Sequence, residues 1–162
     1  MSRVLVYLGR FALIIAGYAV ASVAGSAFLN LLFLGSLDLT PDEAASAFPG
    51  SIVFSIPFVA IFVAYFAFVP SIVAILVAEV LGRRDWLYYA LAGGAVSVVM
   101  LVLFFGARPL AEASLETVRI VLSIVGAGVV AGVAYWLTAG RNAGSWRDRA
   151  AARIPPSGLT PS

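Results

Sequence analysis

The sequence contains no cysteine, no histidine and no lysine, and each absence removes a class of chemistry. Without cysteine there is no disulfide and no thiolate nucleophile, and without histidine no imidazole holds a haem. A zinc site would need a shell made of carboxylates alone, which is unusual. Without lysine no side chain forms a Schiff base with a carbonyl substrate. We therefore expect no catalytic residue, no metal site and no cofactor, and we predict that the protein is not an enzyme.

Charge is scarce as well. Charged residues make up 11% of the 162 residues, whereas soluble domains have about 25%. Hydrophobic residues make up 62%, whereas soluble domains have roughly 45–50%. A soluble chain of this length cannot bury so much apolar surface, so lipid must be part of its solvent. The net charge of +2 is small and the arginines stand at the ends of apolar stretches, so the pI near 9.3 does not indicate a nucleic-acid partner.

Four apolar stretches are each long enough for the roughly 20 residues that cross a hydrocarbon core. They are residues 11–34, 52–81, 86–105 and 117–138. None alternates polar and apolar residues as barrel strands do, and the first is too long for the core of a cleaved signal peptide. We therefore predict an all-α membrane protein whose residues 1–140 form a bundle of four transmembrane helices. We expect residues 141–162 to form a basic, partly disordered cytoplasmic tail.

The second stretch is longer than a membrane requires. Thirty residues of helix extend about 45 Å, against roughly 30 Å of hydrocarbon. Pro70 removes a backbone donor and clashes with the preceding turn, so a kink is expected there, with Ser71 available to bond the freed carbonyls. We predict one tilted, kinked helix; a re-entrant break at Pro70 is the alternative.

The connection before this stretch carries a helix start. Thr40 is a capping residue, Pro41 suits the first helical position, and Glu43 completes a capping box. A short surface helix is therefore predicted from Pro41 until Pro49 and Gly50 end it. We expect it to be a structural lid on the bundle rather than a binding element.

The arginines are distributed unequally between the two sides of the predicted bundle. Eight fall on one side: Arg3, Arg10, Arg83, Arg84, Arg141, Arg147, Arg149 and Arg153. Only Arg108 and Arg119 fall on the other. Since short cytoplasmic loops carry the excess of basic residues, we expect both termini and the 82–85 turn in the cytoplasm and the 35–50 loop outside. A chain whose basic residues are all arginine, rich in alanine, valine and glycine, suggests a GC-rich bacterial genome, and hence the bacterial inner membrane.

Small residues recur at four-residue spacing on three of the predicted helices. They are Gly17, Ala21 and Gly25, then Ala90 and Gly94, then Gly128 and Gly132. This spacing lets helix backbones approach closely in lipid. We favour packing inside the bundle, and the alternative is an interface with a second copy or another membrane subunit.

Glu79 is the carboxylate nearest the bilayer interior. Arg83 lies one turn further along in the favourable order, so we predict a structural ion pair at the inner interface. A carboxylate deeper in the membrane would instead be a proton or cation site.

Two further polar groups lie within the spans. Arg119 shares a helix face with Glu116 and Glu112, which predicts snorkelling with a local ion pair; a gate or an anion contact is the alternative. Asn30 continues a stripe with Ser22 and Ser26 that we expect to bond a neighbouring helix, unless it lines a narrow path.

Two segments of the chain, residues 79–94 (EVLGRRDWLYYALAGG) and residues 134–144 (AYWLTAGRNAG), carry a resemblance. They resemble small, uncharacterised four-helix inner-membrane proteins of alphaproteobacteria. The resemblance covers about a quarter of the chain; it implies a bacterial inner membrane and carries over no activity or site. Small multidrug exporters have a glutamate deep in their first helix, where this chain has none, and quinone-linked disulfide enzymes need cysteine pairs.

The sequence therefore predicts a non-enzymatic accessory, assembly or envelope-associated component that acts through helix–helix contacts. Its expected partners are the lipid bilayer and either itself or another membrane subunit. The alternative is a small transporter or channel subunit formed by oligomerisation, which would require the polar groups to meet across the midplane.

Overall fold

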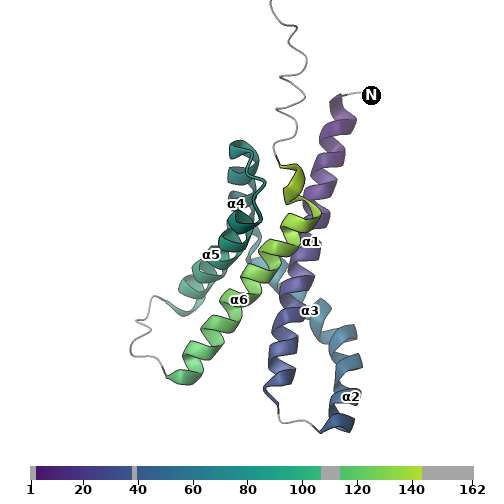
Figure 1. The fold of residues 1–162 in the computed structure, drawn as a ribbon, viewed down its shortest axis with the longest axis vertical. Helices are drawn as coiled ribbons and strands as arrows, with labels where there is room; N and C mark the ends of the chain where they lie inside the picture. Colours follow the sequence, from purple (N-terminus) through teal and green to yellow (C-terminus); the bar gives the residue numbers. More distant parts are fainter. Residues whose placement is uncertain (1–2, 38–39, 107–113, 144–162) are drawn as a thin grey trace, which may run out of the picture.

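The computed structural model describes residues 3–37, 40–106 and 114–143, and its regular elements are helices throughout these ranges (Figure 1). The α-helices are α1 (Arg3–Gly35), α2 (Pro41–Gly50), α3 (Ile56–Phe66), α4 (Phe68–Leu81), α5 (Trp86–Phe105) and α6 (Leu115–Thr138). A π-helical turn, η1 (Ser51–Ser55), joins α2 to α3, and a 3-10 turn, η3 (Gly140–Asn142), follows α6.

Four helical runs are long and apolar enough to cross a membrane. They are Tyr7–Gly35, Pro41–Phe66, Trp86–Phe105 and Leu115–Thr138. The predicted all-α class with four potential spans is therefore confirmed. Residues 144–162 of the predicted tail lie outside the described residues.

Local capping explains two helix starts. Glu43 accepts hydrogen bonds from the backbone N–H (2.9 Å) and the hydroxyl (2.7 Å) of Thr40, so the predicted capping box forms and α2 begins at Pro41. The hydroxyl oxygen of Ser114 accepts the N–H of Thr117 (3.2 Å), which begins α6 at Leu115.

The second apolar stretch differs from the single kinked helix expected. Its helical run begins at Pro41 and continues through η1 and α3, and it breaks at Ala67 before α4. The residues of α2 whose burial is described are all exposed, so none of these residues packs against the bundle as the expected lid would. The break is not re-entrant, because α4 continues to the opposite end of the bundle from α2 (Figure 1).

Helix α6 is the centre of the packing, because it lies against α1 on one side and α5 on the other. Helix α3 packs on α1, while α4 touches α5 along a much smaller surface. Helices α5 and α6 bury three residues each, whereas α3 buries only Ala60 and α4 only Ala78. The bundle is therefore a tight α1–α6–α5 layer that carries an α3–α4 arm, in which α3 packs on α1 and α4 packs sparsely.

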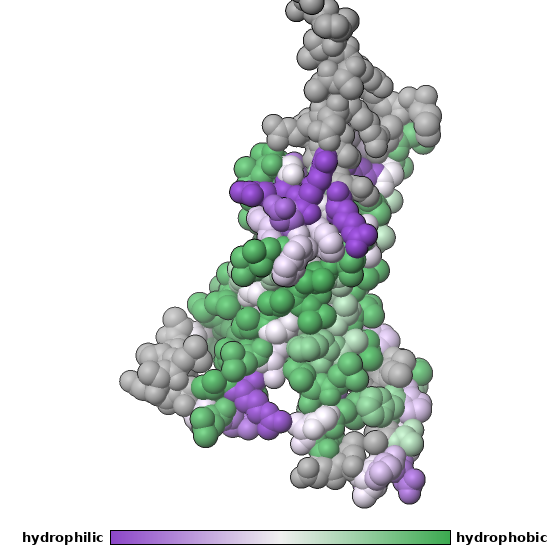
Figure 2. All heavy atoms as spheres, viewed as in Figure 1, coloured by the Kyte–Doolittle hydropathy of each residue, from purple (hydrophilic) through white to green (hydrophobic). Residues whose placement is uncertain are grey.

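The two ends of the bundle carry different charges. Figure 1 places the start of α1, the α4–α5 turn and the last turn of α6 at one end, which we call the basic end because Arg10, Arg83, Arg84 and Arg141 lie there. The opposite, acidic end carries Asp42, Glu43, Glu116 and Arg119. Figure 2 shows hydrophobic side chains over the middle and hydrophilic ones towards both ends, as a membrane-spanning bundle requires.

Candidate functional site

The polar stripe of α1 faces the start of α3. Ser26 donates a hydrogen bond from its hydroxyl to the carbonyl of Ile56 (2.7 Å), and Ser55 donates to the side-chain oxygen of Asn30 (2.5 Å). Asn30 in turn donates to the carbonyl of Ser26 (2.9 Å). Ser26 and Asn30 are both buried. The contacts of Ser26 and Asn30 join α1 to the neighbouring helix, as expected for the stripe, at the π-helical turn that follows Pro49. Ser22 instead donates to the carbonyl of Tyr18 on its own helix (3.0 Å).

Tyr18 extends the same stripe by one more turn, and the sequence analysis attached no role to it. Its hydroxyl donates to the carbonyl of Ala64 (2.7 Å). The last helical hydrogen bond of α3 runs from Ala67 N–H to Val63 (2.9 Å), and the first of α4 runs from Ser71 N–H to Ala67 (3.0 Å). The carbonyl of Ala64 therefore has no helical donor, and Tyr18 supplies one. The signal that would have revealed this was the four-residue spacing from Tyr18 to Ser22.

Ser71 was expected to bond the carbonyls freed near Pro70. The backbone N–H of Ser71 donates to the carbonyl of Ala67, but the side chain of Ser71 lines a cavity. The expected position of the distortion is also corrected, because regular hydrogen bonding stops at Ala67, three residues before Pro70. Proline has no N–H and clashes with the carbonyl four residues earlier, so the disturbance falls on the turn before it.

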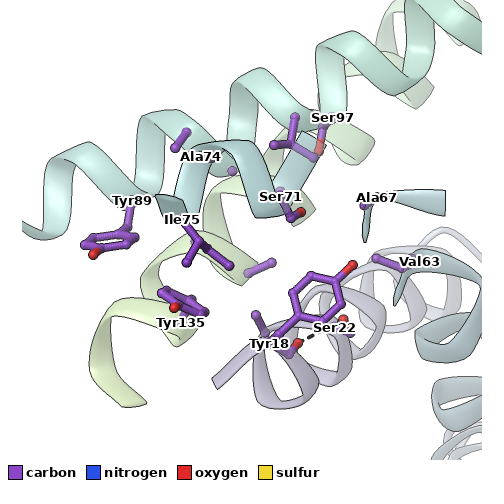
Figure 3. Close-up of a pocket in the computed structure, with 17 residues that line it drawn as sticks. Tyr18, Ser22, Val63, Ala67, Ser71, Ala74, Ile75, Tyr89, Ser97 and Tyr135 are labelled. Carbon is purple, nitrogen blue, oxygen red and sulfur yellow. Dashed lines mark hydrogen bonds between the residues drawn. The ribbon is translucent and has the colours of Figure 1, made fainter. Parts of the chain in front are cut away.

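Five helices surround a cavity of about 100 Å³ beside this break (Figure 3). Its wall is mostly apolar and includes Ala67 itself. The hydroxyl-bearing residues that line it are Tyr18, Ser22, Ser71, Tyr89, Ser97 and Tyr135. Irregular backbone is tolerated at membrane depth where protein buries it or where it borders a cavity. The break at Ala67 therefore lies in the wall of this cavity.

Glu79 forms an ion pair, but with a different partner from the one expected. One guanidinium nitrogen of Arg10 on α1 lies 2.5 and 2.7 Å from the two carboxylate oxygens of Glu79 on α4. Arg83 instead lies 3.8 Å from Asp85, in a pair that is largely exposed. The prediction of Arg83 as partner is wrong because α1 passes beside α4 and brings a second guanidinium closer. The Arg10–Glu79 pair links the α3–α4 arm to the tight layer.

Arg119 is exposed near the acidic end of α6. Within the described residues no carboxylate lies within ion-pair distance of it, so the expected pair with Glu116 does not form there. Glu112, the other expected partner, lies outside the described residues. Arg119 lies near the start of α6 at the acidic end, whereas Glu79 lies near the end of α4 at the basic end.

The small residues of α1 face α6. A side chain added at Gly17 would lie 2.8 Å from Cβ of Ala139, and one at Gly25 would lie 3.2 Å from the carbonyl of Ala127. Ala21, between them, is buried. This stripe packs inside the bundle.

The small residues of α6 face α5. A Cβ at Gly132 would overlap the carbonyl oxygen of Tyr89, and a Cβ at Gly128 would overlap Gly93 and the hydroxyl of Ser97. Gly93, which the sequence analysis did not select, is the residue of α5 at this closest approach, whereas Gly94 meets side chains of valines on α6. Close backbone contact between α5 and α6 is the tightest packing in the described bundle.

These positions do not form one site. The cavity wall includes none of the three candidate polar residues, Glu79, Arg119 and Asn30. No charged residue of the described chain belongs to this wall. Within the described ranges, no three acidic side chains come together in a way that would hold a metal ion. Comparison with protein-family models, with functionally described proteins and with solved structures finds no match to this chain.

Proposed function

We propose that the protein is a non-enzymatic component of the bacterial inner membrane, with both termini in the cytoplasm, that acts by binding another membrane protein through its α3–α4 arm. The observation that supports this is the sparse packing of the arm. Helix α4 has 14 residues and buries only Ala78. Packing is the main attraction between helices in lipid, so a helix with so little packed surface gains stability from a partner helix.

The polar groups support the same proposal. Glu79 pairs with Arg10, and Asn30, Ser26 and Tyr18 bond across to η1 and α3. These groups are used in attaching the arm to α1, and the side chain of Arg119 bonds none of them. A conduction path would need polar groups that meet one another across the midplane.

Photo-crosslinking tests the proposal. A photoreactive amino acid is placed at Val69 or Val80 on the outer face of α4, which are 70% and 67% exposed. The matched control positions are Leu103 on α5 and Leu122 on α6, at 69% and 65% exposed. We expect one defined protein adduct from the α4 positions and only lipid adducts from the controls. Lipid adducts from all four positions would refute the proposal.

A transporter or channel subunit is the second candidate, and the cavity beside the break at Ala67 favours it. Broken helices with free carbonyls beside a cavity are typical of substrate and ion sites in transporters. Ser71→Leu fills this cavity. If the second candidate is right, reconstituted vesicles show a flux that Ser71→Leu abolishes while the protein remains folded. If the first proposal is right, the Ser71→Leu variant still forms the protein adduct at Val69.

A further inference from the structure

Three exposed arginines lie at the basic end, two of them in contact with Trp136, and the functions proposed above do not use them. They are Arg83 and Arg84 in the α4–α5 turn and Arg141 after α6. Trp136 donates its indole N–H to the carbonyl of Arg84 (2.7 Å), and the guanidinium carbon of Arg141 lies 4.6 Å from the centre of its ring. Trp136 therefore lies between Arg84 and Arg141.

A second hydrogen bond closes this arrangement. The side chain of Arg84 donates to the carbonyl of Ala143 (2.9 Å), and Ala143 is fully buried and bonded back to Gly140 (3.1 Å). The α4–α5 turn is thus tied to the end of α6. The side chains of Arg84 and Arg141 are thus held in place, so less side-chain entropy is lost when they bind a ligand.

At this end the described side chains carry more positive than negative charge. Glu79 is paired with Arg10, and the 3.8 Å pair of Arg83 with Asp85 is 58% and 71% exposed, where an ion pair contributes little. Among the described side chains, the basic end has two more positive than negative groups. The acidic end has two more negative than positive ones.

Apolar side chains border the arginines on the membrane side. Leu81, Trp86 and Leu137 are 58%, 55% and 50% exposed and adjoin the turn and the end of α6. A ligand that fits both features has an anionic head and an apolar chain. Guanidinium groups bind phosphate oxygens through paired N–H donors, and Arg141 on the face of Trp136 keeps its N–H donors available.

We propose that Arg83, Arg84 and Arg141 around Trp136 form a binding site for the phosphate headgroup of an anionic phospholipid. The acyl chains lie along Leu81, Trp86 and Leu137. This site does not rest on the partner protein proposed above, because its arginines lie in the α4–α5 turn and after α6. Of its residues, Leu81, the last of α4, belongs to the arm.

Thermal unfolding of the full chain in nanodiscs tests this site. The probes are phosphatidylglycerol, which is anionic, and phosphatidylcholine, which is not. We expect a higher melting temperature in phosphatidylglycerol for the wild type. Arg141→Gln and Arg83→Gln should each show a smaller gain in melting temperature. The expected cause is an affinity for phosphatidylglycerol lowered about fivefold, the contribution of one basic residue near an anionic surface. Melting in phosphatidylcholine shows whether each variant still folds.

Arg119→Gln is the matched control, since Arg119 is also exposed but lies at the acidic end. It should keep the full gain in melting temperature from phosphatidylglycerol. An equal loss from Arg119→Gln and Arg141→Gln would mean diffuse attraction to the bilayer and would overturn the site. So would the absence of any preference for phosphatidylglycerol, or the same stabilisation by inorganic phosphate in neutral nanodiscs.

Discussion

The hydroxyl of Tyr18 on α1 donates a 2.7 Å hydrogen bond to the carbonyl of Ala64, one turn before the second apolar stretch breaks. A carbonyl without a donor is costly where no water reaches it. The contact therefore allows α3 to end and α4 to begin inside the membrane without leaving this group unbonded. It also joins the arm to the tight layer near the cavity.

Tyr18→Phe removes this donor and retains the ring. We expect a loss of about 1 kcal/mol in the free energy of unfolding, within the range measured for hydrogen bonds between membrane helices. Titration with a denaturing detergent, followed by circular dichroism, measures the loss. Tyr65→Phe is the control, because Tyr65 is 77% exposed and its hydroxyl bonds no described residue; it should leave stability unchanged. Equal effects of the two substitutions would contradict the role of Tyr18.

Glu79→Gln tests the link between α1 and α4. The side chains of Arg10 and Glu79 are 19% and 16% exposed, so their pairing lies between a surface ion pair and a buried one. We expect Glu79→Gln to lower the free energy of unfolding by about 1–2 kcal/mol, measured by the same detergent titration. The double variant Arg10→Gln with Glu79→Gln should recover part of this loss. Arg83→Gln should have almost no effect on stability. A larger loss from Arg83→Gln than from Arg10→Gln would restore Arg83 as the partner.

Gly132→Leu is predicted to unfold the bundle rather than to separate two copies, because the close partner of Gly132 is α5. Gly132→Ala should already be destabilising by about 1–3 kcal/mol, since its Cβ overlaps the carbonyl oxygen of Tyr89. At Gly9 no atom lies within 4 Å of an added Cβ, so Gly9→Ala should be neutral or stabilising. A thermal melt with a size measurement in mild detergent records both effects. A folded Gly132→Leu variant of reduced size would instead place the groove between copies.

The orientation is tested with reporter fusions. A fusion after Ser46, near the acidic end, should report the periplasm, and a fusion after Arg147 should report the cytoplasm. The reason is the excess of arginines on the side of the termini. The reverse pattern would overturn the orientation, although not the helical fold.

The sequence by itself determined the class of fold and the separation of the charges. Hydrophobic runs of span length leave helix as the available structure in lipid, and this rule needs no knowledge of neighbours. The bounds of α5 and the capping box at Thr40 also follow from residues close together in the chain. Such local features depend on only a few consecutive residues.

Only the tertiary structure decided which helix each special residue faces. The order of helices along the chain does not specify that α6 lies between α1 and α5, so Gly128 and Gly132 on one helix did not reveal Gly93 as their counterpart. In the same way, Arg83 was the nearest base to Glu79 along the chain, but Arg10 is nearer in space. Contacts between residues far apart in sequence depend on how whole helices pack, and in lipid that packing depends on small differences in backbone shape.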